Sequence, residues 1–162
     1  WGSTMQFFFD NTGVGEDGAT YQQFNARIDS YKQGEDGNKF QASCWPNVQG
    51  PEFAKVDEWF HVARTYDAAT GAWKVYVDGV QTHDGVHEFG DPAGPFGDLD
   101  LTSPTMNALY IGGWAAIIDG VNNQGWMSFF NGSVDEVRMY NRALTDQEIG
   151  QLWQQEKLIN LE

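Results

Sequence analysis

The alternation of hydrophobic and polar residues is clearest near the C-terminal end of the sequence. From Val134 to Tyr140 the residues alternate with a period of two, which predicts a strand, and Asn131-Gly132 before them is typical of a turn. The period then changes. Ile149, Leu152 and Trp153 fall at i, i+3 and i+4, which predicts a short amphipathic helix.

The start of this predicted helix carries a recognisable signal. The segment from Thr145 to Glu148 has the spacing of a capping box, in which the threonine hydroxyl and the glutamate carboxylate each accept from the other residue's amide. Leu144 and Ile149 occupy the positions of a hydrophobic staple. Gly150 costs roughly 1 kcal/mol relative to alanine inside a helix, so we expect packing to hold the helix.

Upstream, the pattern predicts short strands joined by glycine-rich turns. Met5 to Phe9 is a short apolar run, Tyr21 to Tyr31 alternates with its apolar set facing inward, and Asn38 to Cys44 reads as a further strand. Gly-Glu-Asp-Gly occurs twice, at residues 15–18 and 34–37, and predicts two acidic hairpin turns.

A central hairpin is predicted from Trp59 to Val77. Trp59 to Tyr66 forms its first predicted strand, and Ala72 to Val77 forms the second after a turn. The second strand has one apolar and one mixed face, as in a half-buried antiparallel strand. Asp78-Gly79 then has the composition of a two-residue type I′ turn.

Two long loops follow the hairpin, from Asp84 to Pro104 and from Trp114 to Met127, with a strand predicted between them from Ala108 to Gly112. Loops of this length in a compact domain are usually functional or mobile. Eight or more short strands, one short helix and long loops together predict an all-β sandwich.

Three stretches resemble, in order and spacing, the laminin-G-like family of concanavalin A-like domains: Trp59 to Gly79, Ala108 to Trp114, and Phe129 to Trp153. The resemblance implies an antiparallel two-sheet jelly-roll sandwich with one short C-terminal helix, as a single domain over residues 1–162. Relatives usually carry further strands before the point at which this sequence begins. Either those N-terminal strands are missing here, or this chain has a shortened version of the family's strand pattern. Because the chain begins with Trp1 rather than Met, we expect a fragment or processed form.

Composition narrows the range of partners. A formal charge of −14, from 23 acidic and nine basic residues, argues against nucleic acid and against an anionic membrane. No apolar run approaches the roughly 18 residues of a membrane-spanning helix, so we expect no membrane insertion. Cys44 stands alone, which excludes an internal disulfide. An extracellular or cell-surface location is therefore implied by the resemblance and not by cysteine pairing.

Asp135 is the most notable carboxylate. The alternation places it on the same face as Val137 and Met139, toward the interior, where a carboxylate needs a partner. The resemblance implies structural calcium here, because relatives often hold calcium with an aspartate at this place in the last strand. A hydrogen-bonded structural aspartate is the alternative. A second candidate calcium site, with oxygen donors in one loop, comprises Asp119, Asn122 and Asn123.

A carbohydrate site needs aromatic platforms beside polar side chains, since sugars present apolar faces ringed by hydroxyl groups. Trp114 and Trp126 bracket a polar loop that contains Asn123 and Gln124, and these four residues form the predicted ligand site. The alternative is that these tryptophans belong to the core or anchor the loop.

The sequence offers no signature of catalysis. Glucanases with this fold place their carboxylates in a Glu-x-Asp-x-x-Glu run, which is absent here. We therefore expect a non-catalytic extracellular module of a larger secreted or surface protein, binding glycan or serving adhesion. One alternative is a structural subunit or repeat of an extracellular filament or surface layer, binding neighbouring protein subunits. Another is an accessory domain of a polysaccharide-degrading enzyme.

Overall fold

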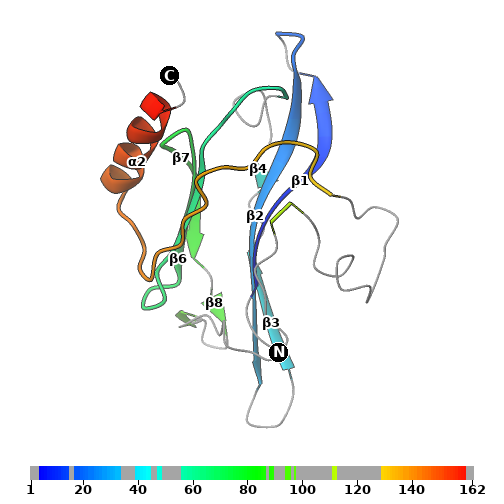
Figure 1. The fold of residues 1–162 in the computed structure, drawn as a ribbon. Coiled ribbons are helices and arrows are strands. Elements are labelled where there is room, and N and C mark those ends of the chain that lie inside the picture. The colour runs from blue at the N-terminus through cyan, green and yellow to red at the C-terminus, as the bar shows by residue number, and fades with distance from the viewer. Residues whose placement is uncertain are drawn as a thin grey trace.

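The structure, a computed structural model, shows antiparallel strands and a C-terminal helix (Figure 1). It describes residues 4–14, 17–33, 39–44, 47–48, 56–86, 88–89, 94–95, 97, 111–112 and 129–159. Every strand pairing among these residues is antiparallel, as the predicted fold class requires. Within the same residues, no helix combines the length and the apolar character needed to cross a membrane.

The first sheet is built around β2. Its strands are β1 (Thr4–Val14), β2 (Thr20–Gln33), β3 (Lys39–Cys44) and the short β4 (Asn47–Val48). They are ordered β1-β2-β3, and β4 also pairs with β2. β1 runs further than the predicted Met5–Phe9, because it resumes its pairing after a register shift between Phe9 and Thr12. Such a bulge lets a strand absorb extra residues without leaving the sheet.

Of the first predicted acidic turn, the structure describes Asp17 and Gly18, which lie between β1 and β2 in the chain. The Asp17 carboxylate accepts from the backbone N–H of Ala19 at 3.0 Å, and Gly18 adopts a φ of 78°, which favours glycine. The second predicted turn, at residues 34–37, lies outside the described residues. The strands that flank it, β2 and β3, pair antiparallel with Gln33 opposite Lys39.

The second sheet contains the predicted central hairpin. Its strands are β5 (Val62–Tyr66), β6 (Ala72–Val77) and β7 (Val80–Val86), in that order. Asp78 and Gly79 have φ values of 50° and 75°, and Val77 pairs with Val80, so the predicted type I′ turn is confirmed. Beyond it, β8 (Glu88–Phe89) pairs with β9 (Gly94–Pro95).

The helix α2 (Asp146–Ile159) begins as the sequence predicts. The Thr145 amide donates to the Glu148 carboxylate at 2.8 Å, and the Glu148 amide donates to the Thr145 hydroxyl at 3.2 Å. The capping box is therefore formed. The staple residues Leu144 and Ile149 are buried together with Tyr76 of β6, which fixes the start of the helix on the second sheet.

The burial of β6 differs from the prediction of a half-buried strand. Val75, Tyr76 and Val77 are all buried, with exposures of 0%, 0% and 6%, although successive residues of a strand point to opposite faces. The reason is α2, whose Ile149 and Leu152 pack against the face that carries Tyr76. Figure 1 shows the helix beside β6 and β7, on the side away from β1 and β2.

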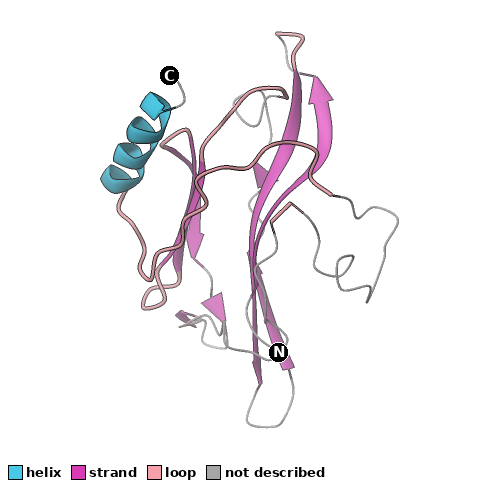
Figure 2. Ribbon diagram, viewed as in Figure 1, coloured by secondary structure: helices cyan, strands magenta, loops and turns pink. Residues whose placement is uncertain are grey.

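The strand predicted from Val134 to Tyr140 is wrong for this structure. The segment has no strand pairing and is drawn as a loop in Figure 2. Glu136 adopts a φ of 52°, which breaks the extended backbone, and its N–H donates to the Asp135 carboxylate at 2.8 Å instead of to a neighbouring strand.

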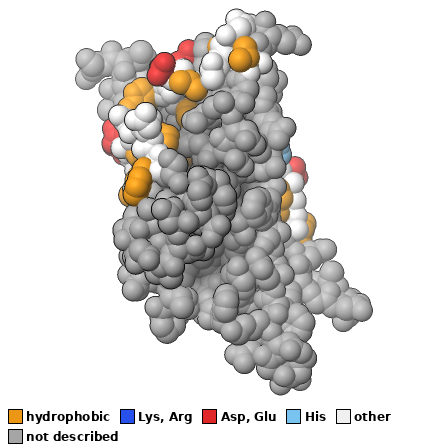
Figure 3. Space-filling model, turned by 90° about the vertical axis from the view of Figure 1, so that its right-hand side faces the viewer, with side chains coloured by type: hydrophobic (Ala, Val, Ile, Leu, Met, Phe, Trp, Pro, Cys, Tyr) orange, Lys and Arg blue, Asp and Glu red, His pale blue; other side chains and the backbone are white. Residues whose placement is uncertain are grey.

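Several hydrophobic side chains of this segment consequently lie at the surface. Val134, Val137 and Met139 are 51%, 52% and 63% exposed, and Phe129 is 60% exposed. In the space-filling view of one face, hydrophobic side chains reach the surface beside acidic ones (Figure 3). Of the strand predicted from Ala108 to Gly112, the structure describes only the last two residues, which form a bend.

Candidate functional site

The predicted ligand site and the loop calcium site both lie outside the described residues. The residues concerned are Trp114, Asp119, Asn122, Asn123, Gln124 and Trp126. Their flanks are described. The N–H of Phe130 donates to the carbonyl oxygen of Gly112 at 2.9 Å. This backbone bond brings the two ends of the loop-bearing segment together, and the six residues remain a prediction.

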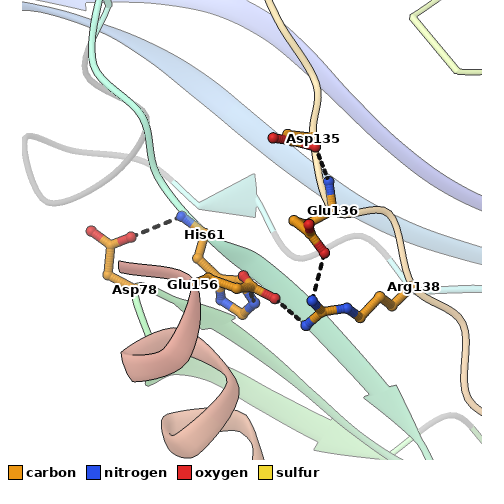
Figure 4. Close-up of polar contacts among 6 residues, drawn as sticks. All are labelled: His61, Asp78, Asp135, Glu136, Arg138 and Glu156. Carbon is orange, nitrogen blue, oxygen red and sulfur yellow. Dashed lines mark hydrogen bonds and ion pairs between the residues drawn. The ribbon is translucent and has the colours of Figure 1, made fainter. Parts of the chain in front are cut away.

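Asp135 does not point to the interior as the alternation predicts. Its side chain is exposed, and one carboxylate oxygen accepts from the Glu136 amide (Figure 4). Calcium takes six to eight oxygen ligands, whereas Asp135 offers one carboxylate. Among the described residues no group of three or more His, Cys, Asp or Glu side chains is arranged to hold a metal ion. Calcium at Asp135 would therefore need ligands from water or from beyond these residues.

A junction of charged side chains, which the sequence did not predict, connects the segment from Val134 to Tyr140 to the helix. Arg138 donates from one guanidinium nitrogen to Glu136 and from the other to Glu156 of α2, each at 2.5 Å (Figure 4). Arg138 is 36% exposed, whereas Glu156 is 12% exposed. A charge-assisted pair to a largely buried carboxylate is stronger than a fully exposed one. The pair therefore positions this segment beside the end of α2.

His61 is the fourth side chain of this junction. It directly precedes β5, and its backbone N–H donates to the Asp78 carboxylate at 2.9 Å, which supports the turn between β6 and β7. Its Nε2 lies 3.5 Å from a carboxylate oxygen of Glu156, and its ring centroid lies 6.1 Å from that of Trp153.

The protonation of His61 is shifted by these surroundings. Burial is the largest influence and lowers the pKa from the usual 6.5, because the cationic form loses solvation. Glu156 and Asp78 act in the opposite direction, and Arg138 adds to the lowering. Nδ1 of His61 is buried and has no hydrogen-bond partner among the described atoms. These surroundings favour the neutral imidazole.

A second polar cluster holds the first turn of α2. One carboxylate oxygen of Asp146 accepts from both Lys74 and the Tyr76 hydroxyl, each at 2.7 Å. The hydrogen bond from Lys74, followed by that from Tyr76, lowers the pKa of Asp146. Burial, with the hydrogen bond to Asp146, raises the pKa of Tyr76. The helix is thus fixed to β6 by polar contacts at its start, beside the hydrophobic cluster.

Sequence reasoning missed the charged junction for a physical reason. His61, Arg138 and Glu156 come from three segments far apart in the chain, and no local spacing connects them. Each charged group pairs with another, which is the arrangement of a structural contact between segments. Arg138 is a charged residue at an outward-facing position of an alternating stretch, and this was the signal in the sequence that could have pointed to an ion pair here.

Comparison with known proteins places the chain in context. A sequence model described as the concanavalin A-like lectin/glucanases superfamily matches residues 2–150. No curated protein matches the sequence. Among solved structures, the chain is similar to residues 221–444 of an S-layer domain-containing protein from Clostridium thermocellum, with 17% sequence identity and a TM-score of 0.41. The similarity covers 93% of this chain and 64% of that one, so the chain spans less than two thirds of that structure.

Proposed function

Because the chain belongs to the concanavalin A-like lectin/glucanase superfamily, we propose that it is a non-catalytic module that binds carbohydrate outside the cell or at its surface. The family match over residues 2–150 is the observation that carries this proposal. The superfamily contains sugar-binding and sugar-cleaving proteins, so the family alone does not choose between them. The missing Glu-x-Asp-x-x-Glu run favours binding.

The proposed fold is a jelly roll in which two antiparallel sheets pack face to face. Antiparallel pairing in both described sheets and the C-terminal helix support it. Val75 and Val77 support it as well, since they are buried on the face of β6 opposite Tyr76.

The proposed sugar site is the loop that carries Trp114, Asn123, Gln124 and Trp126. The hydrogen bond between Phe130 and Gly112 supports it, because both tryptophans are within a few residues of this junction in the sequence. An indole ring offers an apolar platform for a sugar ring, and the two amides offer donors and acceptors for its hydroxyl groups.

A screen of immobilised oligosaccharides and polysaccharides, with the wild-type chain and three variants, tests this function. Trp114→Ala and Trp126→Ala should each weaken binding about fivefold or more, because one stacked ring contributes on the order of 1–3 kcal/mol in comparable aromatic stacking. Trp59→Ala is the matched control, since Trp59 is 62% exposed and lies outside the proposed site. Equal binding by all four proteins would contradict the assignment, as would binding lost equally in all three variants.

Protein–protein assembly is the second candidate function. The observation that favours it is the exposed hydrophobic surface of the segment that precedes α2, including Phe129, Val134 and Met139. Such a module would bind neighbouring protein subunits in a filament or surface layer. Sedimentation analysis distinguishes the two, because concentration-dependent association that is lost in Met139→Ser would favour assembly.

A further inference from the structure

Glu156 of α2 is shared between side chains from two other segments. One of its carboxylate oxygens accepts from Arg138, which precedes the helix, and the other lies 3.5 Å from Nε2 of His61, ahead of β5 (Figure 4). The side chains of Glu156 and His61 are only 12% and 14% exposed, so water and salt screen their contact weakly. A single carboxylate thus joins three segments of the chain.

Within the described part of the chain, the charges that face His61 come from three segments packed against it. Glu156 of α2 and Asp78 of the β6–β7 turn favour the cationic ring, and Arg138 opposes it. Glu136 neutralises part of that opposition, since it pairs with Arg138 at 2.5 Å. A further cation, Lys157, does not contact His61 directly. Its Nζ lies 5.5 Å from the centroid of the Trp153 ring, which in turn lies beside His61.

A proton on His61 would change the balance of this junction. The imidazolium would compete with Arg138 for the Glu156 carboxylate and would place a second positive charge near the guanidinium. Burial already disfavours that cation in the folded state. Because the folded-state pKa lies below 6.5, the stability from neutral His61 is complete above pH 6.5 and is lost as the pH falls toward the folded-state value.

We propose that His61, Glu156 and Arg138 form a pH-responsive latch, which holds α2 on the second sheet near neutral pH and loosens it when His61 takes up a proton. The latch acts on the helix because Glu156 lies on its last turns and Trp153 covers the same histidine. The helix start is held independently by Asp146, Lys74 and Tyr76, so loosening begins at the C-terminal turns.

Hydrogen exchange of the full chain tests the latch, at about pH 8 and about pH 5, which bound the range in which histidine titrates. After correction for intrinsic exchange rates, the amides of residues 152–159 should lose protection several-fold at the lower pH, and those of β6 should lose less. His61→Gln should lose this difference, because glutamine does not titrate. His83→Gln is the matched control and should behave like the wild type, since His83 lies on β7 and is also partly buried.

Two results would overturn the latch. One is unchanged protection of α2 in the wild type at the two pH values, and the other is an equal loss in the wild type and in His61→Gln. If His61→Gln does not fold, a second measurement on the wild type alone tests the latch.

In this measurement, NMR follows the carbon resonances of the His61 ring and the amide resonances of α2 as the pH changes. A common midpoint supports the latch, and α2 amides that do not follow His61 refute it.

Discussion

Gly79 lies where both the backbone and the packing exclude a side chain. Its φ is 75°, and a Cβ built on it would lie 2.7 Å from Cδ1 and 3.0 Å from Cβ of Trp153. The Trp153 Cβ cannot move away without shifting α2, so the turn between β6 and β7 and the helix constrain each other. Gly79 is therefore required twice, once for the positive φ of the turn and once for the close approach of Trp153 in α2.

Replacing Gly79 tests this contact directly. Gly79→Ala should destabilise the protein more than Gly18→Ala, because Gly18 has a similar φ of 78° but nothing within 4 Å of its Cβ position. Gly18→Ala should cost about 1–2 kcal/mol of unfolding free energy from the backbone, and Gly79→Ala about 1–3 kcal/mol more from the clash. Denaturant unfolding measures both. Equal losses would show that Trp153 does not occupy the space beside the turn.

Glu148 combines the capping box with an ion pair to Arg142. Hydrogen bonds from Arg142, and then from Thr145, lower its pKa from 4.5 to about 2. Because the folded-state pKa is the lower one, the stabilisation is complete above pH 4.5 and is lost as the pH falls toward 2.

The Tm of Glu148→Gln should therefore lie below that of the wild type above pH 4.5, and the gap should close toward pH 2. Gln147→Ala, in the same first turn, changes no ionisable group and serves as the control. Scanning calorimetry across this pH range gives the two differences. A gap for Glu148→Gln that is constant with pH would contradict the role of its carboxylate.

At the scale of elements, α2 was predictable and the segment before it was not. The helix depends on contacts three or four residues apart, such as the capping box of Thr145 and Glu148, and these are visible in the sequence. The segment from Val134 to Tyr140 carries the alternation of a strand, but pairing requires a partner from elsewhere, which alternation cannot specify. Here the left-handed φ of Glu136 ends the extended backbone, and Asp135 becomes exposed.

Gly150 gives a test of how α2 is held. A Cβ at Gly150 would meet nothing within 4 Å, so Gly150→Ala should stabilise the protein by about 0.5–1 kcal/mol through helix propensity. For a chain of this size that corresponds to a rise in Tm of about 1–4 °C. Ile149→Val, at the neighbouring buried position, should instead cost about 0.5–1.5 kcal/mol. A fall in Tm for Gly150→Ala would show that the space is filled.

For the whole molecule, the family could be recognised from the sequence. The candidate site could be predicted only as a set of residues, without their arrangement. Ordered motifs such as Trp59 to Gly79 and Phe129 to Trp153 depend on turns and caps that short spacings reveal. The junction of His61 with Glu156 could not be predicted, because it depends on how α2 lies against the second sheet. The predicted sugar ligands and the loop calcium ligands lie outside the described residues, so they remain predictions.

Calcium removal tests the predicted metal. Binding to the native state alone stabilises by about 2.7 kcal/mol when free calcium is a hundredfold above Kd, which should raise Tm by about 5–10 °C relative to excess chelator. Asp135→Asn should abolish the rise while keeping an oxygen for the Glu136 amide. Asp84→Asn, another exposed carboxylate, is the control and should retain the rise. A wild-type Tm that is unaffected by chelator would contradict calcium at Asp135.

We propose that this member of the superfamily binds carbohydrate without cleaving it. Isothermal titration calorimetry with the oligosaccharide that binds best in the screen, followed by chromatography of the recovered sugar, tests both parts at once. We predict saturable binding by the wild type, a loss of about fivefold or more in affinity for Trp114→Ala, and recovery of the sugar at its original length. Absence of binding heat for that oligosaccharide, or recovery of shortened sugar, would contradict the proposed function.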